Sequence, residues 1–278
     1  MRITLDPSRA SGVGAHAPSI GASPPVPAWT CAAHLNAPSR GEMIIRGSMH
    51  LLVMATAVMF SMPAVAQDSG FFAGLDASAG MAHGSSGTKN GGGFGGGGVV
   101  RRVRFGTTAG IGAHAGYRFD RHLSGFLSYQ HVRGDVSWDA HFSQLGQTTN
   151  FSGTAISNAV LLNMAYDWLP SDTTTIRATV GIGATFNKLS GITEKFEGAF
   201  VAEVENHTRT SPIVQIGASI QHHLTPKTTL GLNAAVSYAG GFKTGPTRTG
   251  NLGKTDINPY EIDDVWRAGL GVSVQTRF

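Results

Sequence analysis

The chain has a single cysteine, Cys31, so it cannot build a disulfide framework. Charged residues are also scarce, at 14% of the chain. After the first 66 residues, no apolar run is long enough for a membrane-spanning helix. Low charge without a helical membrane segment favours all-β architectures.

The chain also lacks a large excess of charge of either sign, since its net charge is only +4. The first 66 residues carry four of the 21 Lys and Arg residues and two of the 17 Asp and Glu residues, which leaves +2 for the remainder. A nucleic-acid-binding domain shows a much stronger basic patch. We therefore expect no nucleic-acid partner.

The N-terminal region divides into two segments of different composition. Residues 1–42 are rich in Ala, Pro, Ser and Gly and have no apolar periodicity, so we assign them no fold. Residues 43–66 have Arg46, then an apolar run at 51–60, then the small-residue site that ends at Ala66. This order is typical of a secretory signal peptide.

A signal peptide so far inside the sequence suggests that translation starts at Met43 or Met49. We expect cleavage after Ala66, which sends the protein out of the cytoplasm. The folded part is then one domain over residues 67–278.

The last stretch, residues 265–278, alternates strictly between apolar and polar or glycine positions. Its apolar set begins with Trp266 and ends with Phe278, and Arg267 and Arg277 lie on the other face. A strand repeats every two residues, so one face is apolar and the other polar. This pattern is typical of a strand with lipid on one side and a polar interior on the other.

Seven further segments show the same alternation, with turn signals between them. Connections after the second, fourth and sixth segments are short, and the other connections are long. Outer-membrane barrels sort their connections in this way. We predict an all-β fold, an eight-stranded antiparallel up-and-down transmembrane β-barrel with short periplasmic turns and long extracellular loops. The expected strands cover residues 71–81, 107–119, 123–133, 154–168, 176–186, 213–224, 229–238 and 265–278.

This arrangement gathers the aromatic residues of the strands at two levels. Two girdles of this kind mark the membrane–water interfaces of a barrel. The periplasmic girdle would hold Phe71, Tyr117, Phe119, Tyr166, Trp168 and Phe278, and the outer girdle Tyr129, Phe186, Tyr238 and Trp266.

These features resemble the small outer-membrane β-barrel proteins of Gram-negative bacteria, of the opacity-protein or OmpA-barrel type. The resemblance rests on the signal peptide, the eight segments, the Gly-Tyr-Arg-Phe ending at 116–119, the pattern at 161–167 and the terminal Phe278. It implies residence in the cell outer membrane, contact with lipid and lipopolysaccharide, and a monomer. In that class a terminal aromatic belongs to the signal read by the barrel-assembly machinery, a role that Phe278 would inherit.

The lumen of an eight-stranded barrel is just wide enough to be filled by side chains. Charges enclosed there must pair, because an isolated buried charge is very costly. We expect an interior network that joins the two aspartates to some of the four arginines, either as a polar plug or as a gated ion path. Its members are Asp76, Arg118, Asp167, Arg177, Arg267 and Arg277.

A run of arginines, Arg101, Arg102 and Arg104, precedes the second predicted strand. Guanidinium groups bind phosphate bidentately, so these residues are candidates for contact with lipopolysaccharide phosphates at the outer rim. A solvated charge run on a loop explains them equally well.

Catalysis receives little support from the residues. Ser157-Asn158 stands near the outer end of a strand as in the lipid A deacylase pattern, but Ala155 replaces the histidine. His141 and Ser143 have the right spacing but no evident partner carboxylate. We expect no enzyme, no cofactor and no metal site.

The favoured function is a structural and surface-interaction role, such as adhesion or envelope integrity, in which four loops could bind a host or envelope ligand. A narrow porin-like channel and a lipid A or phospholipid-modifying enzyme remain the alternatives. The expected loops cover residues 82–106, 134–150, 187–210 and 239–264. Their aromatics are either exposed contact residues or packed against one another: Trp138, Phe142, Phe196, Phe200 and Phe242.

Overall fold

The computed structural model describes residues 69–88, 98–143, 145–168, 173–251 and 253–278, and the proposed segments 1–42 and 43–66 lie outside these ranges. None of the described residues forms a helix long and apolar enough to cross a membrane. The strands are β1 (Gly70–Ser86), β2 (Val99–Arg118), β3 (Leu123–Phe142), β4 (Gln147–Trp168), β5 (Thr174–Phe196), β6 (Ala199–Val204), β7 (His207–His223), β8 (Thr228–Tyr238), β9 (Phe242–Lys243), β10 (Thr247–Gly250), β11 (Gly253–Asp256) and β12 (Glu261–Arg277).

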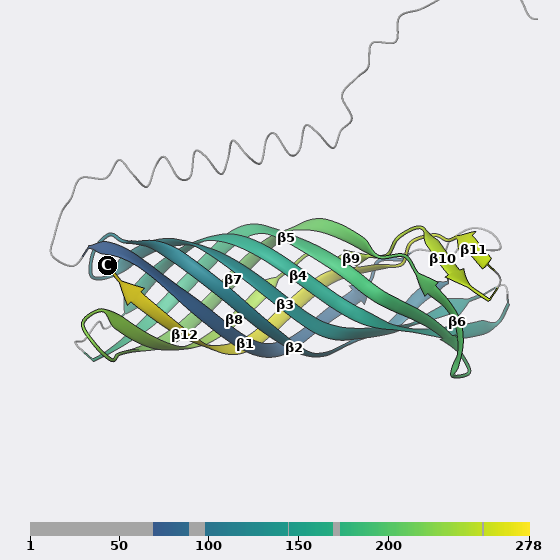
Figure 1. The fold of residues 1–278 in the computed structure, drawn as a ribbon, viewed down its shortest axis with the longest axis horizontal. Helices are drawn as coiled ribbons and strands as arrows, with labels where there is room; N and C mark the ends of the chain where they lie inside the picture. Colours follow the sequence, from purple (N-terminus) through teal and green to yellow (C-terminus); the bar gives the residue numbers. More distant parts are fainter. Residues whose placement is uncertain (1–68, 89–97, 144, 169–172, 252) are drawn as a thin grey trace, which may run out of the picture. The chain divides into compact units, whose positions relative to one another are not determined.

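Eight of these strands form a closed ring in which every strand pairs antiparallel with both of its neighbours (Figure 1). The order around the ring is β1, β2, β3, β4, β5, β7, β8 and β12. The ring closes where β12 pairs with β1, from Phe72 opposite Arg277 to Ser86 opposite Ile262. The predicted eight-stranded up-and-down barrel is therefore confirmed.

Short connections lie at the end of the barrel that holds the C-terminus, which we call the turn end (Figure 1). Between β2 and β3, the Asp120 carboxylate accepts the backbone N–H groups of His122 at 2.7 Å and Leu123 at 2.8 Å. These hydrogen bonds hold the pKa of Asp120 below its ordinary value. Between β7 and β8, Thr225 Oγ1 accepts the backbone N–H of Thr228 at 2.9 Å. Side-chain caps thus fix both turns.

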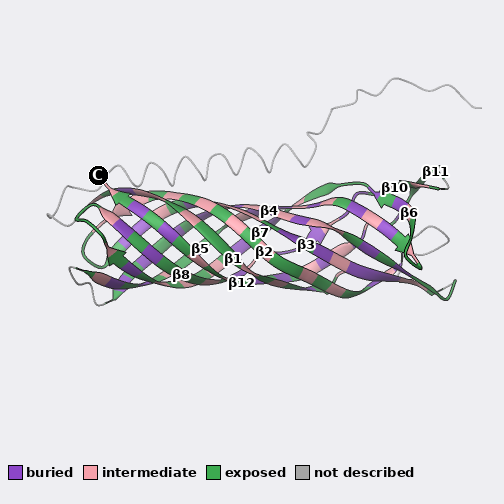
Figure 2. Ribbon diagram, turned by 60° about the horizontal axis from the view of Figure 1, so that its bottom comes forward, coloured by how far each residue is buried: buried purple, intermediate pink, exposed green. Residues whose placement is uncertain are grey.

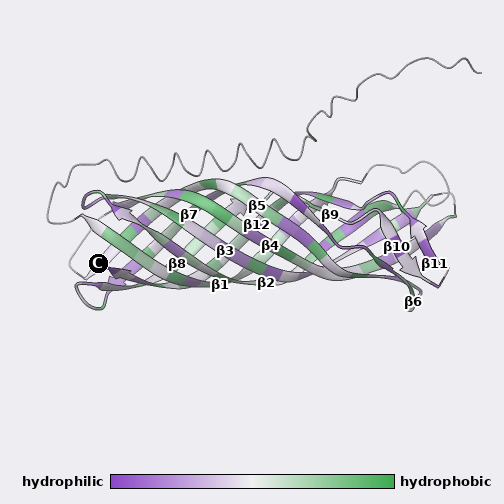
Figure 3. Cartoon of the chain, turned by 45° about the horizontal axis from the view of Figure 1, so that its top comes forward, coloured by the Kyte–Doolittle hydropathy of each residue, from purple (hydrophilic) through white to green (hydrophobic). Residues whose placement is uncertain are grey.

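The outward face of the barrel next to the turn end is apolar. Burial and hydropathy alternate along these strands, and large apolar side chains such as Leu75, Ile182 and Leu270 are among the exposed residues (Figures 2 and 3). Aromatic rings meet at both limits of this band: Phe71 and Tyr117 lie 5.0 Å apart between centroids, and Tyr238 and Trp266 lie 5.4 Å apart. A closed sheet with this exterior is a transmembrane barrel of the outer-membrane type.

The opposite end, which we call the extension end, differs from the predicted loops. β3 runs on to Phe142 and β4 begins at Gln147, so most of the predicted loop 134–150 is a continuous hairpin. β5 similarly continues to Phe196 and turns into β6 through Glu197 and Gly198, which have positive φ angles of 49° and 83°. Two such residues form the tight turn that suits a hairpin. The strands predicted from the sequence were therefore too short at the extension end.

The reason is that the polarity of the two faces reverses along the strands: the inward face changes from polar to apolar, and the outward face from apolar to polar. On β3, the inward positions continue in phase from Ser124 and Ser128 to Val136 and Trp138. On β4, they continue from Asn163 to Phe151. Beyond the lipid, water lies outside the barrel, so apolar side chains face inward there. The alternation persists, but it no longer looks like that of a lipid-facing strand.

These inward apolar residues form a packed cluster inside the extension end, which we call the outer core. The rings of Trp138 and Phe151 stack with an interplanar angle of 3° and centroids 5.4 Å apart, and Tyr260 packs on Phe151 at 4.7 Å. Burial in this cluster raises the pKa of the Tyr260 hydroxyl well above its ordinary value. The outer core consists of Val100, Val136, Trp138, Ala140, Phe151, Ala155, Leu189, Ile192, Val204, Phe242, Ile257, Tyr260, Ile262 and Val265.

Ion pairs and one asparagine fasten the remaining segments to this end. Arg248 Nη1 of β10 lies 2.8 Å from Glu194 Oε2 of β5, and the Glu194 side chain is almost fully buried. Asn187 Nδ2 donates to the carbonyl oxygens of Ala239 at 2.7 Å and Gly241 at 3.0 Å. The segment after β8 is thus tied to β5, and the extension end is a folded structure.

Candidate functional site

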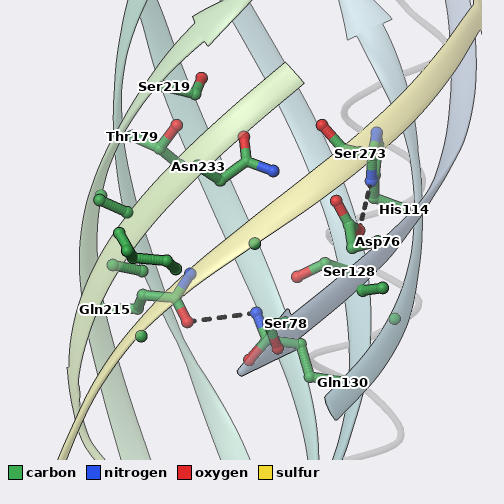
Figure 4. Close-up of a pocket in the computed structure, with 18 of the residues that line it drawn as sticks. Asp76, Ser78, His114, Ser128, Gln130, Thr179, Gln215, Ser219, Asn233 and Ser273 are labelled. Atoms are coloured by element: carbon green, nitrogen blue, oxygen red, sulfur yellow. Dashed lines mark hydrogen bonds and ion pairs between the residues drawn. The ribbon is translucent and has the colours of Figure 1, made fainter. Parts of the chain in front are cut away.

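The lumen beside the apolar exterior is the first candidate site, because polar and charged side chains converge there. It contains a cavity of about 200 Å³ whose lining comes from all eight strands of the ring. β4 contributes Asn163 alone, and β5 contributes Arg177 and Thr179. Figure 4 shows ten of the polar residues that line it, and Gln130 Nε2 donates to Gln215 Oε1 across the lumen at 3.2 Å. The interior is therefore polar and crossed by hydrogen bonds.

Asp167 is the centre of an ion-pair cluster near the turn end. Arg177 donates to both carboxylate oxygens, from Nε at 2.6 Å and from Nη2 at 3.0 Å. Arg118 Nη2 donates to the same carboxylate from β2. Asp167 and Arg177 are almost completely buried, so the bidentate geometry compensates the loss of hydration. The cluster joins β2, β4 and β5 from inside.

Asp76 lies elsewhere in the lumen and has a different partner from the arginine that we expected. Its Oδ2 is 2.8 Å from Nδ1 of His114 on the neighbouring strand (Figure 4). Phe72 and Phe126 pack on the His114 ring. A Cβ atom at Gly74 would lie 2.5 Å from His114 Nε2, so glycine makes room for the ring. The neighbouring strands β1 and β2 thus supply both groups, and a histidine stands at Asp76 where we expected an arginine.

The two remaining lumen arginines differ from each other. Arg277, near the turn end, is engaged by other groups of the protein. Arg267, near the outer girdle, exposes 9% of its surface, and its Nε, Nη1 and Nη2 have no hydrogen-bond partner among the described residues. Among the described residues, Arg267 is therefore an arginine of the expected network for which neither aspartate is a hydrogen-bond partner.

The rim arginines lie on β2 beyond the apolar band. Arg102 has a positive φ of 50° at an irregularity in the β2–β3 register, and its Nε lies 3.0 Å from Asp139 Oδ2. Arg101 is opposite Asp139 in the register, and Arg104 is opposite Ser137. All three arginines are exposed, but Asp139 already compensates part of their charge.

Two further basic residues escaped the sequence analysis because they fall at or beyond the expected strand ends. Arg133 of β3 and Lys188 of β5 are both register partners of Ile156 on β4. By strand alternation both point outward, Arg133 four residues beyond Tyr129 and Lys188 two residues beyond Phe186. Neither forms an ion pair with a described residue. Both residues could have been found in the sequence by continuing the outward-facing positions of the alternating pattern past the expected strand ends.

Most of the loop aromatics proposed as contact residues are not available for contact. Trp138 and Phe242 are buried in the outer core, and Phe142 packs against it. Phe196 is half-buried, and Phe200 is 46% exposed. The alternative interpretation, packing of these segments against one another, holds for the first three.

The residues considered for catalysis have structural partners. Ser157 is buried and donates to Asn187 Oδ1 at 2.6 Å. His141 Nδ1 lies 3.0 Å from Thr148 Oγ1 across the β3–β4 hairpin. Within the described ranges, no three His, Cys, Asp or Glu side chains are grouped so that they could hold a metal ion.

No family model and no curated protein matches the chain. Among solved structures, it is similar to Neisserial surface protein A, with 15% identity over 76% of this chain and 100% of the other and a TM-score of 0.39. It is also similar to the outer membrane protein OprG from Pseudomonas aeruginosa, with 12% identity, 76% and 98% coverage and a TM-score of 0.44. It is similar as well to a major outer membrane protein from Thermus thermophilus, with 14% identity over 75% of this chain and 99% of the other and a TM-score of 0.47. Such distant likenesses carry no functional information, and the fold rests on the strand pairing above.

Replacement of Asp167 tests the ion-pair cluster. Asp167→Asn leaves Arg118 and Arg177 buried without a carboxylate, so the free energy of unfolding should fall by about 3–5 kcal/mol. Urea unfolding of the barrel in lipid vesicles measures this change. The control Asp256→Asn, at an exposed position of β11, should change the stability by about 0.5 kcal/mol or less. Equal stability of Asp167→Asn and the wild type would contradict the pairing.

Proposed function

We propose that the protein is an outer-membrane barrel with a structural and surface-interaction role, and that it does not conduct ions steadily. The observation that carries this proposal is the outer core, which fills the lumen at the extension end with tightly packed apolar side chains. In outer-membrane barrels, the short turns face the periplasm, so the extension end faces outward. A dry apolar plug is a barrier to ions, because a charge loses its hydration there.

The same observation disfavours the porin-like alternative and defines the surface for interaction. A partner would meet the exterior of the extension end and its hairpin tips, including Phe200 on β6, which is exposed. The rigid sheet beneath these tips favours adhesion or envelope integrity over transport. The buried aromatics stabilise this platform instead of contacting a partner.

Conductance measurements test the sealed lumen. Wild-type protein in planar bilayers should show no steady current. The variant Trp138→Ala/Phe151→Ala creates a cavity in the outer core that costs about 3–5 kcal/mol per large side chain. It should therefore show frequent openings. Phe200→Ala, at an exposed aromatic near the same end, should stay closed like the wild type. A large steady conductance of the wild type would overturn the proposal.

We also propose that outward basic residues contact lipopolysaccharide phosphates. Arg133 and Lys188 support this best, because they flank Ile156 just beyond the outer aromatics and face lipid headgroups. Strand spacing places them about 10 Å apart. Arg101, Arg102 and Arg104 lie farther from the band, and Asp139 pairs with Arg102 and lies opposite Arg101, so we assign these arginines a weaker part.

Lipopolysaccharide binding by purified protein tests this contact. Arg133→Ala/Lys188→Ala should weaken binding about tenfold or more, since each charge-assisted hydrogen bond contributes about 1.5–3 kcal/mol. Arg101→Ala/Arg104→Ala should have a smaller effect, and Lys254→Ala, on β11, should have none. The loss should vanish with dephosphorylated lipopolysaccharide. Unchanged binding of the Arg133/Lys188 variant would refute the contact.

Phe278 is proposed as the assembly signal. Phe278 is 78% exposed, and its backbone N–H donates to the Phe71 carbonyl at 3.0 Å, where β12 meets β1. The exposed ring is available to the barrel-assembly machinery. Deletion of Phe278 should lower the amount of heat-modifiable barrel in outer-membrane fractions, whereas Phe278→Trp should keep it. Wild-type levels of the truncated protein would argue against this role.

A further inference from the structure

We propose that the lumen holds a small inorganic oxyanion of the sulfate or phosphate type, bound by the guanidinium of Arg267. This site goes beyond the structural role above and does not depend on it.

The first observation is that Arg267 is buried and unpaired. Only 9% of its surface is exposed, and none of its three guanidinium nitrogens has a partner among the described residues. A buried charge without a partner is very unfavourable, whereas the other charged side chains of the lumen interact with groups of the protein. Asp167 engages Arg118 and Arg177, and Asp76 engages His114. Within the part of the chain that the structure describes, Arg267 therefore lacks a counter-charge.

The second observation is the charge balance of the inward face within the apolar band. Alternation places four arginines and two aspartates on this face: Arg118, Arg177, Arg267, Arg277, Asp76 and Asp167. The excess is positive, and it cannot be relieved from the extension end. Val265, the next inward residue along β12, already belongs to the outer core. An anion that enters the lumen is thus attracted to the positive charge and retained below the outer core.

The third observation is the chemistry of the cavity into which Arg267 extends. Its volume is about 200 Å³, and its lining includes Ser78, Gln215 and Ser237, whose hydroxyl and amide groups can donate hydrogen bonds. Guanidinium presents a planar fork that matches two oxygens of an oxyanion. The one carboxylate of the lining, Asp76, is occupied by His114. The site therefore favours a compact oxyanion over a cation or a large organic acid.

Sulfate titration of matched variants tests this site. Wild type, Arg267→Met and Lys254→Met are refolded into detergent micelles over a sulfate series at constant ionic strength, and the thermal unfolding midpoint is measured. Lys254 is exposed on β11 and serves as the control. The midpoints of wild type and Lys254→Met should rise with sulfate, and that of Arg267→Met should not. Refolding in sulfate lets the anion reach the lumen before the barrel closes.

Selenate, an isostere of sulfate, supplies a direct readout. Crystals of the wild type grown with selenate should give an anomalous selenium peak within hydrogen-bond distance of the Arg267 guanidinium. If Arg267→Met does not fold, Arg267→Lys keeps the charge without the fork and should show a weakened sulfate response. An equal sulfate response of all variants overturns the proposal. A selenium peak together with an equal response would mean an adventitious ion only and would overturn it as well.

Discussion

The structure depends on one constraint: in hydrocarbon, every backbone N–H and C=O group of a strand must find a partner within the protein. The pairing of β12 with β1 meets this constraint, because it leaves no free edge in the ring. Closure then creates an enclosed face, and the outward face must match lipid. The polar residues of each strand are therefore directed into the lumen, where ion pairs such as Arg177–Asp167 must replace water.

Past the lipid, the same ring has water outside, and the requirement on its two faces is reversed. The inward phase of β3 and β4 changes from serine and asparagine to valine, tryptophan and phenylalanine without a break in pairing. The register irregularity at Arg102 keeps Val100 and Val103 on the side of the outer core despite the extra residue. One continuous sheet thus forms a membrane barrel at one end and a packed core of the soluble type at the other.

Much of this could be predicted from the sequence. Alternation with exposed apolar residues located all eight strands within the lipid, and the parity of Asp167, Arg118 and Arg177 placed them on one inward face. The extensions were missed because a strand with inward apolar and outward polar residues looks like a polar loop when lipid is expected outside. Partner choice was also beyond the pattern: Asp76 meets His114 because β1 and β2 are adjacent and Gly74 leaves space, and neither alternation nor charge encodes that contact.

The β5–β6 turn is a place where the surface of the protein can accept an insertion. Glu197 and Gly198 form the tip of a hairpin, and a Cβ atom added at Gly198 would meet nothing within 4 Å. The strands below the tip are held by the buried Glu194–Arg248 pair, so the tip carries no packing of its own. A foreign peptide inserted between these two residues would be displayed beyond the sheet on a fixed base. The barrel thus separates a paired scaffold from an exposed tip that has room for an insertion, although the positive φ of Gly198 still favours glycine at that position.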